Sequence, residues 1–289
     1  MKFRVLHETR YRYDSPVALS QQLLHLSPRP VAFQECTAHR IVVDPVPAET
    51  LAREDYFGNP VTQITLAASH QALAVRAESE VTVLPRSAPA ATPAWEAVRD
   101  SLRAAPTPEL LEPLQFAFES PHVETFRDLA AYALPSFTRG RPVLEAALDL
   151  NRRIHADFTF DARATSVSTP LREVLQKKRG VCQDFAHLMA GCLRTLGLPA
   201  RYVSGYILTR PPPGRPRLVG ADASHAWVGL WCGASTWVDL DPTNDCLVGE
   251  QHVTLGWGRD FSDVTPMRGV ILGGGEQVLD VGVTVTPED

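Results

Sequence analysis

A segment that is apolar at most positions begins at Cys182 and ends near Leu196, and it constrains the fold more than any other feature of this chain. Its apolar stripe recurs at helical spacing through Phe185, Met189, Cys192 and Leu196. Gly197 and Pro199 follow directly, and these residue types end helices. A helix that is apolar on most sides has to be buried on most sides. The sequence therefore predicts a central helix enclosed by other elements, with Cys182 in its first turn.

The first 85 residues have the pattern of strands. From Phe3 to Tyr13, apolar or aromatic side chains alternate with charged ones at a period of two. Further strand candidates are Ile41–Val43, Val61–Ala67 and Leu73–Leu84. Short strands separated by turns such as Gly58-Asn59-Pro60 predict an antiparallel sheet or a small sandwich. The stretch Pro85–Pro93 is rich in Pro, Ala, Ser and Thr, and it predicts a domain junction.

Beyond the junction the pattern becomes helical and then returns to strands. Ser120-Pro121, Pro142 and Thr169-Pro170 place proline where a helix begins. The later strand candidates are Ala200–Leu208, His225–Trp231, Trp237–Asp241 and Val278–Val285, and Pro211-Pro212-Pro213-Gly214 is expected to be a surface loop. A helix followed by strands predicts an α+β fold. We assign residues 1–85 to an N-terminal antiparallel β domain, 86–140 to a helical connecting region, and 141–289 to a core that includes the C-terminal strands.

Composition excludes several classes of function. The formal net charge is -5 with a pI near 6.0, and the basic runs are short, so we expect neither nucleic acid nor a membrane surface as partner. Charges interrupt the N-terminal residues, and no apolar run is long enough for a bilayer, which favours a cytoplasmic protein. Five cysteines without a close pair favour reduced thiols and no zinc site. No motif for a nucleotide, flavin or other cofactor is present.

Cys182 is the candidate nucleophile. It follows Gly180-Val181 and stands where the unpaired N–H groups and the helix dipole favour a thiolate. Asp184, two residues on, is expected to complement the same helix terminus. The other cysteines lack a helix-start signal, and Cys192 lies on the core stripe. We expect Cys36, Cys192, Cys232 and Cys246 to be structural.

A thiolate enzyme also needs an imidazole to hold and return the proton, and a group to orient that imidazole. His187 is five residues after Cys182, so a helix would turn it away from the sulfur. His225 begins a strand and is the better candidate. Asp239 and Asp241 face the same way on one strand, and spacing alone barely separates them. Asp241 is favoured because it stands at the strand end, just before Pro242.

Three segments resemble the motifs of the bacterial transglutaminase-like superfamily, in the family's order. They are Arg179-Gly180-Val181-Cys182-Gln183-Asp184-Phe185-Ala186-His187, Asp222-Ala223-Ser224-His225-Ala226-Trp227 and Asp239-Leu240-Asp241-Pro242-Thr243-Asn244. His7–Tyr13 and Asp55–Asn59 are similar to the family's N-terminal bacterial β domain, and Gly258–Val270 to its C-terminal signature. The family often has tyrosine where Phe160 stands, so a hydroxyl role there has no counterpart in this chain.

The resemblance implies a papain-like fold, in which the helix bearing the cysteine packs on an antiparallel sheet, and a triad of Cys182, His225 and Asp241. It implies attack on peptide or glutamine amides through a thioester, with a peptide or protein substrate and no cofactor. Gln183, Tyr206 and Trp227 are the candidates for lining the substrate cleft. Hydrolysis is favoured over transfer to an amine. A non-catalytic peptide-binding scaffold remains a rival, whereas a thiol redox protein would need a resolving cysteine near Cys182. The oligomeric state is left open.

Overall fold

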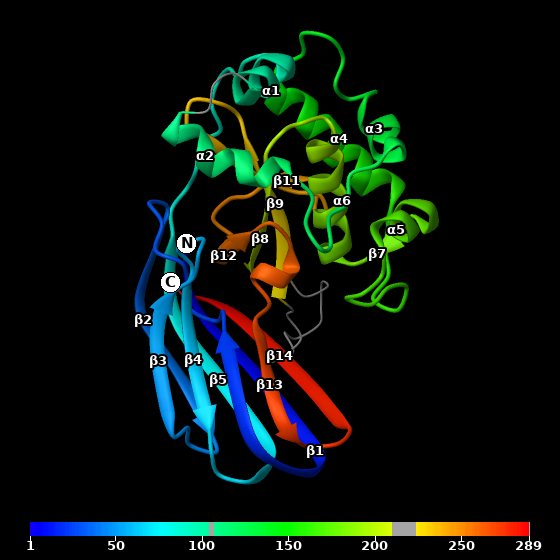
Figure 1. Cartoon of the computed structure of the whole chain (residues 1–289). Coiled ribbons are helices and arrows are strands. Elements are labelled where there is room, and N and C mark those ends of the chain that lie inside the picture. The colour runs from blue at the N-terminus through cyan, green and yellow to red at the C-terminus, as the bar shows by residue number, and fades with distance from the viewer. Residues whose placement is uncertain (104–106, 210–223, 289) are drawn as a thin grey trace, which may run out of the picture.

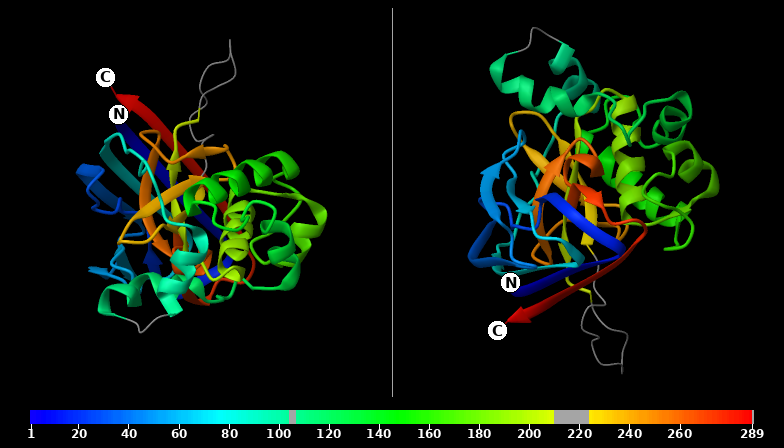
Figure 2. Two further views of the ribbon diagram at one scale, coloured as in Figure 1. Left: turned by 90° about the horizontal axis from the view of Figure 1, so that it is seen from above. Right: turned by 60° about the horizontal axis from the view of Figure 1, so that its bottom comes forward.

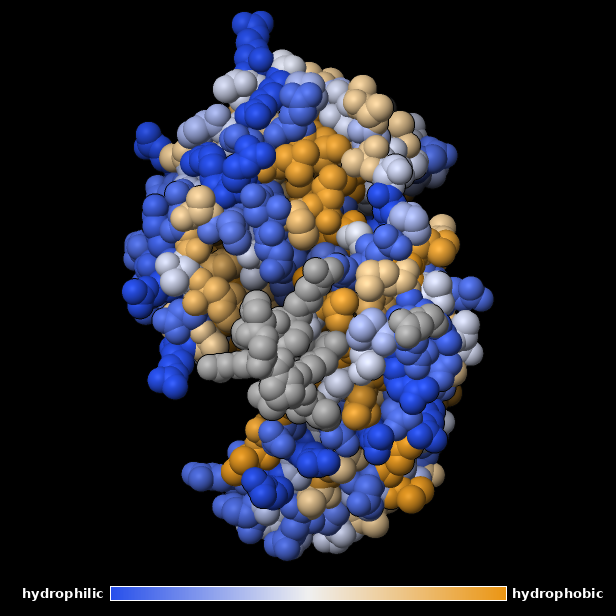
Figure 3. All heavy atoms as spheres, turned by 180° about the vertical axis from the view of Figure 1, so that it is seen from behind, coloured by the Kyte–Doolittle hydropathy of each residue, from blue (hydrophilic) through white to orange (hydrophobic). Residues whose placement is uncertain are grey.

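A computed structural model describes residues 1–103, 107–209 and 224–288. It divides into a β lobe, at the bottom of Figure 1, and a mixed lobe of helices and strands above it. Seen from behind, the molecule is hollowed between the two lobes (Figure 3). The expected loop Pro211–Gly214 and the motif residues Asp222 and Ala223 lie outside the described residues. No helix in the described ranges combines the length and the apolarity that a membrane span requires.

The β lobe is an antiparallel sheet built around one long strand. β1 (Lys2–Leu24) is 23 residues long and pairs with β5 (His70–Val83) and β14 (Gln277–Glu288) along its first half. Its second half pairs with β4 (Pro60–Leu66) and β13 (Met267–Gly273). The outer strands are β2 (Gln34–Asp44) beside β5 and β3 (Glu49–Glu54) beside β4. The alternation at the N-terminus has the expected consequence, since Phe3, Val5 and His7 are buried while Lys2 and Arg4 are exposed.

The sequence assigned residues 141–289 to one core, but the C-terminal strands lie outside it. β13 and β14 leave the mixed lobe and complete the sheet of the N-terminal β lobe, with Lys2 opposite Glu288 and Tyr13 opposite Gln277. Val283 and Val285 are fully buried against Phe3 and Val5 there. Burial of these apolar side chains accounts for the return of the chain, because β1 would otherwise expose that face to water. The two chain ends therefore lie side by side (Figure 2).

The mixed lobe encloses the apolar helix as the sequence predicts. α6 (Cys182–Thr195) packs against an antiparallel sheet of five strands, in the order β11 (Cys246–Leu247), β10 (Trp237–Asp241), β9 (Ser224–Trp231), β8 (Ala200–Ile207) and β12 (His252–Gly258). Every residue from Asp184 to Arg194 is buried. The prediction of an α+β fold, with the cysteine-bearing helix packed on an antiparallel sheet, is confirmed.

Helices α3 (Arg127–Ala133), α4 (Val143–Asp157) and α5 (Leu171–Lys177) pack against α6 (Figure 1). The other helical segments of the described residues are α1 (Trp95–Arg103), α2 (Pro108–Leu114), η1 (Gln115–Ala117) and η2 (Phe261–Asp263), which follows β12. The short strands β6 (Thr159–Phe160) and β7 (Arg179–Gly180) pair in parallel just before α6. Pro142 and Pro170 precede α4 and α5 directly. The expected helix start at Ser120-Pro121 is wrong, because Ser120 and Val123 close a turn through mutual backbone hydrogen bonds and α3 begins only at Arg127.

Candidate active site

Cys182 is the first residue of α6, and the surrounding chain fixes that helix start. The carboxylate of Asp184 accepts hydrogen bonds from the backbone N–H of Val181, at 2.7 Å, and from the hydroxyl of Thr165, at 2.6 Å. Gly180 permits this contact, because a Cβ at that position would lie 2.5 Å from Oδ2 of Asp184. The thiol of Cys182 is half-buried, with Sγ 3.9 Å from the carbonyl oxygen of Ser224. The nucleophile candidate therefore lies between the helix start and the start of β9.

His225 and Asp241 meet at the neighbouring ends of β9 and β10. Nε2 of His225 lies 2.7 Å from Oδ2 of Asp241, and both side chains are buried, at 7% and 0% exposure. Burial alone would lower the pKa of His225, but hydrogen bonds to Asp241 and to Cys182 outweigh it and raise the pKa to about 10. Because Nε2 is engaged by Asp241, Nδ1 is the ring nitrogen left for Cys182. The structure thus brings together the three side chains that the sequence singles out.

Asp241 is held as an anion by several donors. Burial would raise its pKa, but hydrogen bonds from His225, His252 and Asn244 hold the pKa well below the usual range of a carboxylic acid. Its Oδ1 accepts the backbone N–H groups of Thr243 and Asn244, at 2.9 and 3.2 Å. Its Oδ2 accepts the side-chain amide of Asn244 at 2.7 Å. The Asp-Pro-Thr-Asn turn therefore folds around this carboxylate and fixes its position at the end of β10.

His252 is a site residue that the sequence analysis missed. Its Nε2 lies 3.2 Å from Oδ2 of Asp241, and the side chain is buried. The backbone N–H of Gly249 points at Nδ1, 3.4 Å away, so Nδ1 is the acceptor and Nε2 carries the proton donated to Asp241. His252 begins β12, whose place beside β8 is set by pairing across the sheet. No motif surrounds it, and only that register reveals its position.

His225, Asp241 and His252 also form a cluster whose candidate ligand atoms lie within 4.8 Å of one another, among the residues described. The hydrogen-bond pattern does not fit a metal site. Both Nε2 atoms direct a proton at the same carboxylate oxygen. A cation there would displace both protons and release the ring of His225 from Asp241. The three residues are therefore arranged as a hydrogen-bonded cluster.

Asp239, the other candidate for the acid that orients the imidazole, has different partners. Its carboxylate lies 2.9 Å from Nη1 of Arg86 and 3.6 Å from Nη2 of Arg201. The guanidinium of Arg201 in turn stacks on the rings of Trp237 and Trp257. Asp239 is thus the anion of a buried ion-pair cluster, and it is Asp241 that contacts His225.

The candidate cleft residues differ in their surroundings. Tyr206 is 1% exposed, in the core between the lobes, and its hydroxyl pairs with Nδ1 of His7 at 2.9 Å, so it does not line a cleft. Trp227 is fully buried with its ring centroid 6.1 Å from that of His225 and 5.3 Å from that of His252, and it packs behind the site. Gln183 is half-buried next to Cys182.

Other residues considered for catalysis have structural positions. Nε2 of His187 accepts the backbone N–H of Phe261, and its ring stacks on His122. Cys192 and Cys232 are buried, and burial raises the pKa of each thiol to about 12. Tyr202 lies on the sheet beneath α6, and burial together with the charges of Cys182 and Asp184 raises the pKa of its hydroxyl. The phenol of Tyr202 is therefore neutral near Cys182.

Comparison with known proteins gives a consistent result. Residues 3–82 match the bacterial transglutaminase-like N-terminal region, and residues 131–242 match the transglutaminase-like superfamily. An uncharacterized protein of Mycobacterium tuberculosis is 41% identical over 297 residues, covering 99% of this chain and 93% of the relative. A protein-glutamine gamma-glutamyltransferase of Pseudomonas aeruginosa is 36% identical over 103 residues, covering 35% of this chain and 15% of that protein.

Among solved structures, one from Cytophaga hutchinsonii, described as a proposed cysteine protease, superposes with a TM-score of 0.77 at 18% identity. The match covers 100% of this chain and 92% of that one, so the two share both lobes of the fold. The match to the superfamily spans the segments that contain Cys182, His225 and Asp241. The chain belongs to the transglutaminase-like superfamily and has that family's bacterial N-terminal region.

Proposed function

We propose that this protein carries out thiol-dependent acyl transfer on peptide or glutamine amides, with Cys182 as nucleophile, His225 as acid and base, and Asp241 as the group that orients His225. The observation that carries the proposal is the position of the His225 ring. Its Nε2 is fixed on Asp241, while Cys182 is a hydrogen-bond partner that raises the pKa of the imidazole. An imidazole held in this way is suited to pairing with a thiolate.

In the proposed reaction, the Cys182 thiolate attacks the carbonyl carbon of the amide and forms a C–S bond. The C–N bond breaks, and the departing amine takes the proton from Nδ1 of His225. A thioester remains. His225, now neutral, accepts a proton from the incoming water, and the resulting hydroxide attacks the thioester carbon. The C–S bond breaks, which releases a carboxylic acid and restores the ion pair.

The negative charge on the carbonyl oxygen needs hydrogen-bond donors in the transition state. The first four N–H groups of an α-helix have no intrahelical acceptor, and Cys182 is the first residue of α6. Its backbone N–H is therefore the natural first donor. The positive end of the helix dipole adds to the same effect.

Water is proposed as the acceptor of the acyl group because the Cys182 thiol is half-buried and not sealed, so water reaches a thioester formed there. Transfer to an amine is the second candidate. It is favoured by the local similarity to the Pseudomonas aeruginosa gamma-glutamyltransferase. The two outcomes share every step up to the thioester.

The test is incubation of the protein with casein in the presence of a fluorescent primary amine, followed by mass spectrometry. Hydrolysis predicts new peptide ends or glutamine residues converted to glutamate, which appear without added amine. Transfer predicts the amine attached to glutamine side chains. Both products should be absent with Cys182→Ala. If wild type and Cys182→Ala give the same products over a panel of protein substrates, the protein acts as a scaffold and the proposal is wrong.

A further inference from the structure

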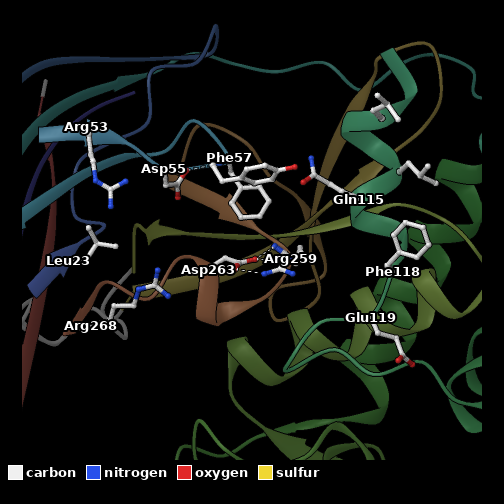
Figure 4. Close-up of a pocket in the computed structure, with 13 residues that line it drawn as sticks. Leu23, Arg53, Asp55, Phe57, Gln115, Phe118, Glu119, Arg259, Asp263 and Arg268 are labelled. Carbon is white, nitrogen blue, oxygen red and sulfur yellow. Dashed lines mark hydrogen bonds and ion pairs between the residues drawn. The ribbon is translucent and has the colours of Figure 1, made fainter. Parts of the chain in front are cut away.

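A hollow lies where the two lobes meet, and none of the proposed catalytic residues lines it. Its volume is about 750 Å³, which is within the range of pockets that hold ligands. Three parts of the chain contribute: β1 and β3 with the turn after β3, the segment from α2 to Glu119, and the region from Arg259 to β13 (Figure 4). The residues that line it on the helical side include Leu111, Gln115 and Phe118.

Large apolar side chains stand exposed around this hollow. Tyr56 is 83% exposed, Phe118 61% and Leu111 56%. Isolated exposed apolar residues are common on soluble proteins, but several that line one concave surface indicate a binding site. Figure 4 shows Phe118 on the helical side, across the hollow from the arginines of the β lobe.

The carboxylates of the hollow are already engaged within the protein. Asp55 accepts backbone N–H groups of Phe57 and Asn59, at 2.8 and 2.9 Å, and the amide of Asn59. Glu119 accepts both donors of Thr125, and Asp263 pairs with Arg259 through two nitrogens. None of these acids neutralises the arginines at the other end of the hollow.

Arg53 and Arg268 have no carboxylate partner within the described part of the chain. Each donates instead to a backbone carbonyl, Arg53 to Glu54 at 3.3 Å and Arg268 to Ser262 at 2.8 Å, which leaves further N–H donors on both guanidinium groups. Both side chains are exposed and flank Leu23 in Figure 4. They also line an adjoining hollow of about 350 Å³ that has no acidic residue and is otherwise lined by Leu23, Gln21, Gln22, Gln63, Gly269 and Val270.

We propose that these joined hollows bind an extended peptide segment of a partner protein that carries carboxylates next to an apolar or aromatic residue. The carboxylates would lie between Arg53 and Arg268, because guanidinium groups bind carboxylates through paired N–H donors. The apolar side chain would pack on Phe118 and Leu111. A polyanion such as nucleic acid fits less well, since the chain carries a formal net charge of -5. The proposal goes beyond the thiol chemistry and does not depend on it.

The test is selection of random peptides displayed on phage against the immobilised full-length protein. A double variant, Arg53→Glu with Arg268→Glu, is run in parallel. The matched control carries Arg139→Glu and Arg152→Glu, two exposed arginines that line neither hollow. Wild type and control should enrich peptides in which Asp or Glu stands near an aromatic residue. The Arg53/Arg268 variant should lose that enrichment.

The affinity of one selected peptide, labelled with fluorescein, is then measured by fluorescence polarisation. We expect the Arg53/Arg268 variant to bind at least about tenfold more weakly, and Phe118→Ser to weaken binding while the circular dichroism spectrum is unchanged. Binding should persist in Cys182→Ala and fall with added salt. Enrichment of peptides without acidic residues, or equal enrichment by wild type and the double variant, would overturn the proposal. The proposal would also be overturned if two copies of the protein associate through this surface and thereby prevent the peptide from binding.

Discussion

Nε2 of His252 lies 3.2 Å from Oδ2 of Asp241, the same oxygen that His225 approaches to 2.7 Å. The carboxylate that orients the proposed base is therefore itself positioned by a second histidine, from β12. The hydrogen bond from His252 contributes to the low pKa of Asp241. Through Asp241, His252 should affect how firmly His225 is held.

We expect His252→Ala to slow alkylation of Cys182 by roughly tenfold, equivalent to about 1.4 kcal/mol. Asp241 keeps its other donors in this variant, so the loss should be partial. The pKa of Asp241 should rise at the same time, which a purely structural role for His252 would not require. The measurement is the rate of iodoacetamide labelling together with NMR titration. His252→Gln, whose amide can donate to the same oxygen, should restore most of the rate. A rate in His252→Ala equal to that of wild type would remove the positioning role.

The two aspartates of β10 should behave oppositely. Asp241→Asn removes the anion that holds His225, so we expect alkylation of Cys182 at neutral pH to fall by at least about a hundredfold. Asp239→Asn leaves the buried Arg201 and the half-buried Arg86 without a full counter-charge, and we expect a loss of about 3–5 kcal/mol in the free energy of unfolding with little change in the alkylation rate. Urea unfolding and thiol labelling of the two variants give both quantities. The reverse pattern would assign the orienting role to Asp239.

The pKa values of the pair predict how stability depends on pH. The folded-state pKa of His225 is raised above the ordinary value of 6.5, to about 10, so its stabilisation is fully present below pH 6.5 and is lost as pH rises toward 10. The pKa of Asp241 is lowered, so its contribution is present above the ordinary value of 3.8 and is lost as pH falls through the folded-state pKa. The difference in unfolding free energy between wild type and His225→Gln should therefore shrink above pH 6.5. Urea unfolding at several pH values measures it, and a difference that grows with pH would contradict the ion pair.

Gly180 is expected to be necessary for the helix start. The Cβ of alanine at this position would lie 2.5 Å from Oδ2 and 2.8 Å from Cβ of Asp184, so the carboxylate would have to leave Val181 and Thr165. We expect Gly180→Ala to cost about 1–2 kcal/mol of stability, as loss of a helix cap does, and to slow alkylation of Cys182. Gly249→Ala is the matched control, because a Cβ there meets nothing within 4 Å. Equal stability of the two variants would show that this contact is unimportant.

Local patterns in the sequence predicted most of the elements. Alternation along β1 and the apolar run of α6 are produced by burial of one face or of nearly all faces, and burial leaves a signature in the residues themselves. The return of β13 and β14 to the N-terminal sheet has no such signature, because it depends on which distant strand lies beside β1. The prediction of a helix start at Ser120-Pro121 was wrong for a related reason, since a turn and a helix start use the same residue types.

The candidate site divides in the same way. Cys182, His225 and Asp241 stand in segments with recognisable motifs, and the structure places them together. His252 lies in no such segment and reaches Asp241 through the register of β12 on β8. Tyr206 was predicted to line a cleft, but its strand end turns toward the β lobe, where its hydroxyl meets His7. Contacts made across a sheet or between lobes are the ones that the sequence does not reveal.

The most direct test of the account is the pH dependence of iodoacetamide labelling at each cysteine, mapped by mass spectrometry, in wild type and His225→Ala. The account predicts that Cys182 labels fastest and still labels quickly below pH 7, because His225 supports a thiolate there. His225→Ala should shift that reactivity to the alkaline pH of an ordinary thiol. Labelling of Cys182 no faster than that of Cys36 and Cys246, the other half-buried cysteines, would contradict the thiolate–imidazolium pair.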